Sequence, residues 1–170
     1  MHINTLVAAI PQLNLWIDNY IDQHKSSRVC LADAEFSRLP GYFARQILES
    51  TYYVLVPTIE SPPLAEFGLG ELSFEGENYS GITFKDTFFV TSKNESLHFH
   101  EMIHVIQWNE LGPENFLLAY GVGLVKYGYR DSPLEEIAYS MQGRFNAGEY
   151  IKDIEPTVRN HCRELLQQMS

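Results

Sequence analysis

The sequence predicts an α+β fold that is mainly helical, with a small, mostly antiparallel sheet of about three strands. Two observations lead to this prediction. Apolar residues recur at helical spacing along most of the chain, whereas three short runs rich in β-branched and aromatic residues lie between residues 51 and 90. Helices therefore precede and follow the strands, which is the order typical of α+β domains.

The size and composition of the chain fit one globular domain. The chain has 170 residues, of which 45% are hydrophobic and 13% aromatic, and this is enough to form a sizeable core. It contains no internal repeat, low-complexity tract or domain linker. We therefore expect residues 1–170 to form a single domain.

The net charge, the cysteines and the short apolar runs indicate which partners and which compartment to expect. The chain carries 12 basic and 22 acidic residues, a formal charge of -10, which would repel nucleic acid and anionic membranes. Cys30 and Cys162 lie far apart in the sequence and are expected to be free thiols in a reducing compartment. The apolar run at residues 3–10 is too short to span a membrane. We expect a soluble, cytoplasmic protein that binds neither nucleic acid nor membrane.

The first fifty residues are predicted to be helical. A helix is expected to begin just after Pro11, and residues 32–50 predict two short helices because Pro40 and Gly41 interrupt their pattern. The apolar face of the first helix follows the i, i+3, i+4, i+7, i+8 spacing and consists of Leu13, Trp16, Ile17, Tyr20 and Ile21.

Three strands and one loop are predicted in the middle of the chain. Residues 51–57 read as a strand that ends at a proline, and residues 79–84 and 87–90 propose a hairpin. Residues 60–70 hold several prolines and glycines without sustained periodicity. This segment is predicted to be a loop, and such loops often line functional sites.

The second half of the chain is predicted to be helical. Asn94 is a good N-cap for a helix that Gly112 ends, and Pro113 suits the first position of the next helix. A further helix is expected from residue 134 to about 147, and a C-terminal helix after Pro156.

The segment from Leu97 to Trp108 carries the clearest functional signal. It contains His100, Glu101 and His104 in the pattern H-E-x-x-H. On a helix, the i, i+4 spacing places both imidazoles one turn apart on one face, where they can bind one Zn²⁺. The Glu101 carboxylate lies about 100° around the helix, so it can reach a metal-bound water without being a ligand. Apolar neighbours predict that this helix is buried.

Two histidines leave a catalytic zinc one protein ligand short, because such sites usually have three. His98 lies near the motif, but its i, i+2 spacing from His100 turns it to another side of the helix. We expect His98 to lie behind the ligands or on the surface. The third ligand must come from elsewhere in the chain.

The H-E-x-x-H pattern is followed about thirty residues later by a helical E-x-x-A pattern, from Glu135 to Ala138. Together these motifs resemble the glutamate zincins (gluzincins), a family of zinc metallopeptidases with small minimal members. The resemblance covers roughly residues 81–140 and implies a zincin-like fold, with His100, His104 and Glu135 as the zinc ligands.

The resemblance also implies that Glu101 is the general base. The sequence departs from the family at Tyr139, where many of these enzymes have an aspartate that orients a ligating histidine. Metal-bound imidazoles usually need a hydrogen-bond acceptor at the other ring nitrogen. A backbone carbonyl or a carboxylate from the loop would have to serve.

The role of Glu135 has a competing structural interpretation. Ser132 and Glu135 also form a capping box, in which the Glu135 carboxylate would bond back to the N-cap backbone N–H. One carboxylate cannot easily do both, and Glu136 is the alternative ligand.

The expected function is that of a zinc-dependent hydrolase, which the resemblance narrows to a metallopeptidase acting on a peptide or protein. A zinc-bound water would be activated by Glu101, and a nearby donor would stabilise the oxyanion. We name Tyr129 from a group of candidates formed by Tyr120, Tyr127, Tyr129, Arg130 and Tyr139. One alternative is a catalytically silent zincin-fold binding or regulatory module with bound zinc, and another is a helical interaction protein without metal. Glu101 favours the enzyme, because a structural zinc site needs no general base.

Overall fold

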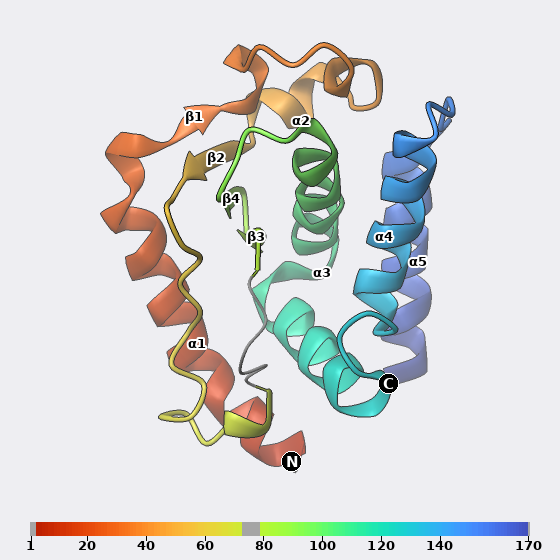
Figure 1. The fold of residues 1–170 in the computed structure, drawn as a ribbon. Helices are drawn as coiled ribbons and strands as arrows, with labels where there is room; N and C mark the ends of the chain where they lie inside the picture. The colour runs from red at the N-terminus through yellow and green to blue at the C-terminus, as the bar shows by residue number, and fades with distance from the viewer. Residues whose placement is uncertain (1–2, 73–78, 170) are drawn as a thin grey trace.

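The computed structural model describes residues 3–72 and 79–169. Within these residues the fold is mainly helical with one small four-stranded sheet, which confirms the predicted mixed class (Figure 1). The helices are α1 (Ile3–Gln23), α2 (Arg45–Glu49), α3 (Glu95–Tyr127), α4 (Pro133–Asn146) and α5 (Ile154–Met169), and the strands are β1 (Val29–Cys30), β2 (Tyr52–Leu55), β3 (Gly81–Phe84) and β4 (Thr87–Val90).

The sheet has the strand order β1-β2-β4-β3. The pairs β1–β2 and β3–β4 are antiparallel, as expected for most of the sheet, whereas β2 and β4 are parallel. The predicted hairpin is therefore present, with Lys85 in its turn at φ 59°. Strand β1 was not predicted, because two residues are too few to show a period of two.

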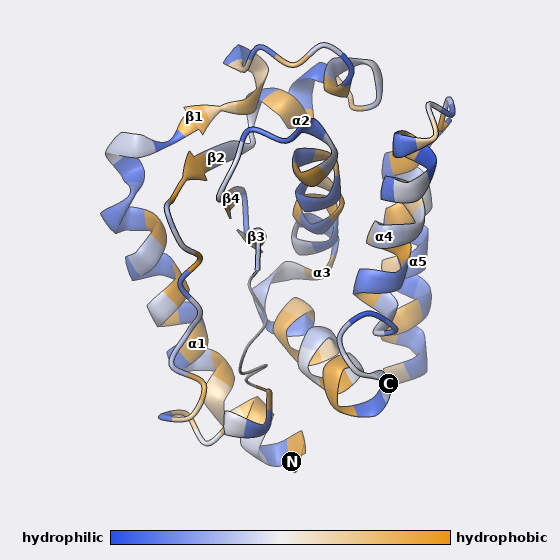
Figure 2. Cartoon of the chain, in the orientation of Figure 1, coloured by the Kyte–Doolittle hydropathy of each residue, from blue (hydrophilic) through white to orange (hydrophobic). Residues whose placement is uncertain are grey.

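Helices cover both faces of the sheet. The ring of Tyr20 in α1 packs on Phe89 at a centroid distance of 4.6 Å, and the ring of Phe88 lies 5.2 Å from that of His98 in α3. Every residue of β4 is buried for this reason. Helices α4 and α5 pack against α3 on the side away from α1 (Figure 1), and Figure 2 shows hydrophilic and hydrophobic residues alternating along the outer helices.

The N-terminal helix is longer than the sequence suggested. It begins at Ile3 and contains Pro11, so the prediction that it starts after this proline is wrong. A proline inside a helix leaves the carbonyl four residues earlier without its N–H partner. That residue is Val7, which is half-exposed, so water can bond to its carbonyl. The loss is therefore small enough for the helix to continue.

The helix α3 consists of two segments separated by a kink. Gly112 at the kink has a non-helical backbone with φ 70°, which confirms that Gly112 and Pro113 end one helix and start another. The predicted N-cap is also confirmed, because the Asn94 side chain accepts hydrogen bonds from the backbone N–H groups of Ser96 and Leu97 at 2.9 and 3.2 Å.

The remaining helical predictions were met in part. Residues 32–50 form α2 and two 3₁₀ turns, at Leu31–Asp33 and Leu39–Gly41, where two short helices were expected. Helix α4 agrees with its prediction to within about one residue at each end, and α5 begins two residues before Pro156.

The described helices and cysteines match two simpler expectations. No helix within residues 3–72 and 79–169 is both long and apolar enough to cross a bilayer. Cys30 and Cys162 are both free, and Cys162 is buried while Cys30 is partly exposed.

Candidate metal site

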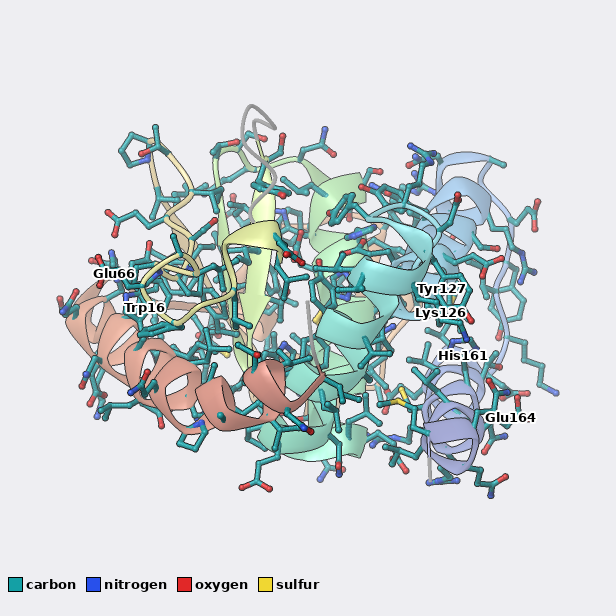
Figure 3. The ribbon with its side chains drawn as sticks, turned by 90° about the horizontal axis from the view of Figure 1, so that it is seen from below. Trp16, Glu66, Lys126, Tyr127, His161 and Glu164 are labelled. Atoms are coloured by element: carbon teal, nitrogen blue, oxygen red, sulfur yellow. The ribbon has the colours of Figure 1, made fainter. Side chains whose placement is uncertain are left out.

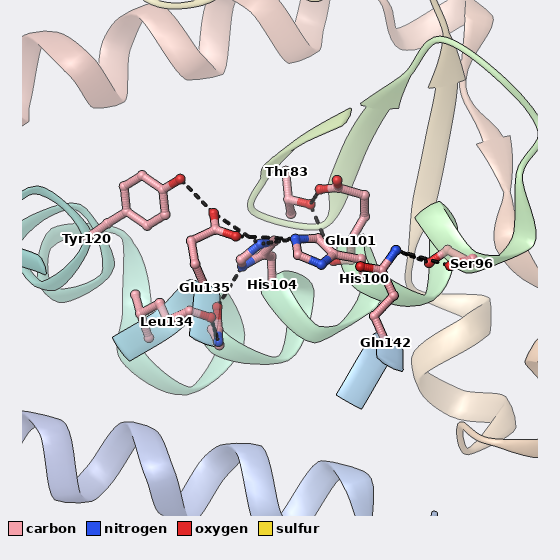
Figure 4. Close-up of polar contacts among 10 residues, drawn as sticks. Thr83, Ser96, His100, Glu101, His104, Tyr120, Leu134, Glu135 and Gln142 are labelled. Atoms are coloured by element: carbon pink, nitrogen blue, oxygen red, sulfur yellow. Dashed lines mark hydrogen bonds and ion pairs between the residues drawn. The ribbon is translucent and has the colours of Figure 1, made fainter. Parts of the chain in front are cut away.

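Three side chains from two helices converge beside the sheet (Figure 4). His100 and His104 come from α3, and their Nε2 atoms lie 3.0 Å apart. Glu135 comes from the first turn of α4, with Oε2 3.3 Å from His100 Nε2 and Oε1 3.5 Å from His104 Nε2. All three residues are buried, with at most 5% of their surface exposed. This buried His-His-Glu group could bind a metal ion.

The three side chains lie close enough to share one ion. Their distances span 3.0 to 3.5 Å, although the two histidines face different oxygens of Glu135. One ligand atom from each residue lies within 4.8 Å of the other two. Glu135 Oε2 is also buried without a hydrogen-bond partner among the described residues, although the His100 ring lies beside it. A metal ion would satisfy this oxygen.

The capping box does not form, and this frees Glu135. Ser132 is the N-cap of α4, but its side chain makes no capping hydrogen bond. The Glu135 carboxylate instead points toward the histidines, and Glu136 is exposed. Successive helical residues point about 100° apart, so only one of the two glutamates can face α3. The structure brings Glu135 to the histidines.

The His104 ring is held by Gln107, which lies one turn further along α3. Gln107 Oε1 lies 2.7 Å from His104 Nδ1, and Gln107 Nε2 donates to the Leu134 carbonyl at 2.8 Å. The second bond fixes the amide so that its oxygen faces the ring, and His104 Nδ1 must then be the donor. This arrangement leaves Nε2 available for a metal. This role of Gln107 was not predicted, although its i+3 spacing from His104 was a usable signal in the sequence.

A Gln107→Leu variant is expected to bind zinc about 10–100-fold more weakly, because the His104 ring loses the acceptor that orients it. Competition with a chromophoric chelator measures the affinity. Gln142→Leu is the matched control, since the side-chain hydrogen bonds of this glutamine in α4 go to Ser96 and none of them goes to a proposed ligand. Equal zinc affinity in the two variants would contradict the role of Gln107.

His100 is held differently from His104. Its Nδ1 atom has no hydrogen-bond partner among the described residues. The ring of Tyr139 packs against the His100 ring at a centroid distance of 4.6 Å. Tyr139 therefore contacts a histidine of the site through its ring. Neither a backbone carbonyl nor a loop carboxylate accepts from His100 in the described part of the chain.

Charge within the group shifts the pKa values of its members. Burial alone would lower the pKa of the His104 imidazole, but the adjacent Glu135 carboxylate raises it to about 9. Burial would raise the pKa of the Glu135 carboxyl, but the two histidines hold it well below its usual range. Without a metal, His104 is therefore protonated and paired with Glu135 at neutral pH.

Zinc binding is expected to release a proton below about pH 9, because a histidine must be neutral to bind a metal. Zinc affinity should then rise about tenfold per pH unit until the pH reaches that value. Isothermal titration calorimetry in buffers of different ionisation enthalpy counts the released protons. Zinc affinity that stays constant between about pH 6 and pH 8 would contradict the pairing of His104 with Glu135.

Glu101 lies beside the group without belonging to it. Its Oε2 atom accepts a hydrogen bond from Thr83 Oγ1 in β3 at 2.6 Å. Burial raises the pKa of this carboxyl, and the two histidines and Thr83 partly oppose that rise. At Gly81 in the same strand, a Cβ atom would overlap Glu101 Oε1. Strand β3 therefore positions Glu101, and it needs glycine at residue 81 to approach so closely.

Two partly buried tyrosines stand near Glu135. Tyr120 donates to Glu135 Oε1 at 2.7 Å. Burial and the negative charge of Glu135 raise the pKa of both Tyr120 and Tyr129, so both stay protonated. Tyr129, the donor named from the sequence, lies on a cavity wall that also includes His100 and Glu101. The hydrogen bond from Tyr120 to Glu135 joins two different helices, so no pattern in the sequence predicted it.

His98 lies in the core. It is fully buried, which excludes the surface position that was one of its two predicted places, and its Nδ1 atom lies 2.8 Å from the Asn94 carbonyl oxygen. Its ring packs among three aromatic rings, those of Phe36, Tyr53 and Phe88. His98 is therefore a core residue of the α3–sheet interface.

A cavity of about 350 Å³ opens beside the group. The two histidines, Glu101 and Glu135 all line it. The segment at residues 60–70, predicted to be a loop near a site, contributes Ser61, Pro62, Leu64 and Leu69 to the wall.

Comparison of the chain with models of known protein families, with curated proteins and with solved structures finds no match. The resemblance to gluzincins therefore rests on the motif residues alone. Any functional conclusion must come from the geometry of the site.

Proposed function

We propose that this protein is a zinc-dependent hydrolase, and more specifically a metallopeptidase. One observation carries the proposal: a buried carboxylate, Glu101, stands next to the His-His-Glu group, is not part of it, and lines the same cavity. A site that only holds a structural metal needs ligands alone. A separate buried base that faces a cavity is what hydrolysis requires.

The ligand set supports zinc. Two imidazoles and one carboxylate form a common catalytic zinc set, and His100, His104 and Glu135 would hold the ion. When bound there, zinc supplies Lewis-acid activation of a water molecule and of the substrate carbonyl. All other steps fall to the side chains of the protein.

Glu101 would accept the proton of the attacking water and pass it to the leaving group. Burial raises the pKa of this carboxyl, which makes the carboxylate a stronger base near neutral pH. Thr83 holds one of its oxygens, so the carboxylate is positioned before substrate arrives. Tyr129 remains the donor that we propose for the oxyanion, because its side chain lines the same cavity as His100 and Glu101.

The position of β3 supports a peptide substrate. In the described sheet, β3 pairs only with β4 and is an edge strand. Its residues Gly81 and Thr83 approach Glu101 directly. An extended peptide can add to such an edge through main-chain hydrogen bonds, and its backbone would then pass beside the general base.

Incubation with a mixed peptide library, followed by mass spectrometry, tests this function. We expect cleavage by the zinc-loaded protein, loss of cleavage after chelation, and recovery when zinc is returned. Stoichiometric zinc with no cleavage of any peptide would favour the catalytically silent module instead. Cleavage that persists in the chelated protein would contradict the proposed metal dependence.

A further inference from the structure

The cavity beside the metal site separates two apolar clusters. The smaller cluster consists of Leu6, Ala9, Leu13, Leu69 and Leu72, and the larger one is the main core. The cavity wall includes members of both, such as Leu6 and Leu13 from the smaller cluster and Ile17, Phe84 and Phe116 from the main core. Apolar voids of this kind favour apolar ligands.

The cavity wall follows a long stretch of α1. Its wall along α1 runs from Leu6 through Leu13 to Ile17, a span of about 16 Å at the rise of an α-helix. Later turns of α3, from Phe116 to Leu124, form another part of the wall. Seen from below, α1 and α3 lie next to each other (Figure 3). A volume of about 350 Å³ spread over this length suits an extended chain better than a compact ring system.

Several polar atoms on this wall already form hydrogen bonds within the protein. The Thr83 hydroxyl donates to Glu101, Trp108 Nε1 donates to the Thr83 carbonyl, and the Tyr120 hydroxyl donates to Glu135. No lysine, arginine or aspartate lines the cavity among the described residues. Along α1 the wall is apolar, with Leu6, Leu13 and Ile17. A polar group of a ligand that is buried against this part of the wall, away from the edge of β3, would lose its hydration without gaining new hydrogen bonds.

We propose that this cavity binds an unbranched hydrocarbon chain of the substrate. The substrate would be an amide or ester whose scissile bond lies at the metal site and whose acyl or alkyl chain extends along α1. Hydrolysis forms a bond from the water oxygen to the carbonyl carbon and breaks the C–N or C–O bond. The proton taken by Glu101 goes to the leaving nitrogen or oxygen. This inference rests on the proposed hydrolase function. It names the substrate class as amides or esters that carry a hydrocarbon chain, and a peptide with such a chain attached next to the scissile bond belongs to this class.

The inference can be tested without measuring hydrolysis, by comparing the affinities of ligands whose hydrocarbon chains increase in length. Linear alkyl hydroxamates of about four to twelve carbons, whose head groups bind metal ions, are titrated into the zinc-loaded protein by calorimetry. Each added methylene is expected to lower Kd about fourfold until the cavity is filled. A Kd independent of chain length, or tighter binding of an aromatic hydroxamate with the same number of carbons, would overturn the inference.

Linear alcohols of the same lengths, titrated into the metal-free protein, separate this inference from the proposed function. Chain-length dependence in the alcohols supports the cavity even if the protein binds no zinc and hydrolyses nothing. Absence of that dependence in both series overturns the cavity proposal and leaves the hydrolase proposal standing.

A pair of glycine variants tests where the chain lies. A Cβ atom at Gly121 would stand 2.6 Å from Leu6 Cδ2, so Gly121→Ala must displace a side chain of the cavity wall. Gly143→Ala is the matched control, because a Cβ there meets nothing within 4 Å and both changes place alanine in a helix. Gly121→Ala is expected to weaken binding of the longest chains about fourfold or more, and Gly143→Ala to leave it unchanged. If both variants fold and bind the longest chains with equal affinity, this placement of the chain is wrong. If Gly121→Ala does not fold, the chain-length series on the unaltered protein decides the proposal.

Discussion

Replacing Glu101 by glutamine is expected to leave zinc bound and to slow hydrolysis by a factor of about 10²–10⁴ or more. Glutamine has nearly the shape of glutamate, so it can occupy the space beside Gly81 and still accept the hydrogen bond from Thr83. It cannot accept the proton of the attacking water. Turnover of a peptide found in the library, measured with zinc content on the same sample, checks both parts of the expectation.

Glu136→Gln is the matched control for this variant. It removes the same charge from an exposed glutamate next to a proposed ligand, and its turnover should equal that of the unaltered protein. Unchanged turnover in Glu101→Gln would remove Glu101 from the mechanism, whatever the metal content proves to be.

Replacing His104 by alanine is expected to abolish tight zinc binding and with it the stabilisation that zinc gives to the folded chain. The variant loses one of the three proposed ligands, and Glu135 and Gln107 each lose their contact with His104. A metal that binds only the folded state stabilises it by about 2.7 kcal/mol at a free concentration of 100 times Kd. In thermal unfolding with and without added zinc, the Tm of the unaltered protein should therefore rise with zinc, and the Tm of His104→Ala should not.

His24→Ala provides the control for histidine removal. His24 lies at the end of α1, where its ring packs on Tyr20 and Phe89, so its loss should lower stability without changing the response to zinc. If zinc raises the Tm of His104→Ala as much as it raises the Tm of His24→Ala, the metal binds elsewhere in the protein.

Local signals in the sequence were enough for much of the fold and for the ligand helix. The Asn94 cap, the break at Gly112 and the i, i+4 spacing of His100 and His104 each involve residues within one turn or one junction. Such features depend on neighbouring residues, so they can be predicted before any tertiary contact is known.

Features that depend on contacts between distant elements could not be predicted in this way. The Thr83 bond to Glu101 joins a strand to α3, and the Tyr120 bond to Glu135 joins the later turns of α3 to α4. The capping box at Ser132 was a valid local pattern that tertiary packing overrode. The helix through Pro11 is a further case, since residues of α1 on both sides of the proline are buried in the fold and the broken hydrogen bond lies at an exposed position.

Elemental analysis of the purified protein, side by side with His104→Ala, tests the central claim most directly. If His100, His104 and Glu135 form a zinc site, the unaltered protein should carry about one zinc per chain and the variant a negligible amount. Equal and negligible zinc in both proteins, or iron in place of zinc in the unaltered protein, would contradict the account.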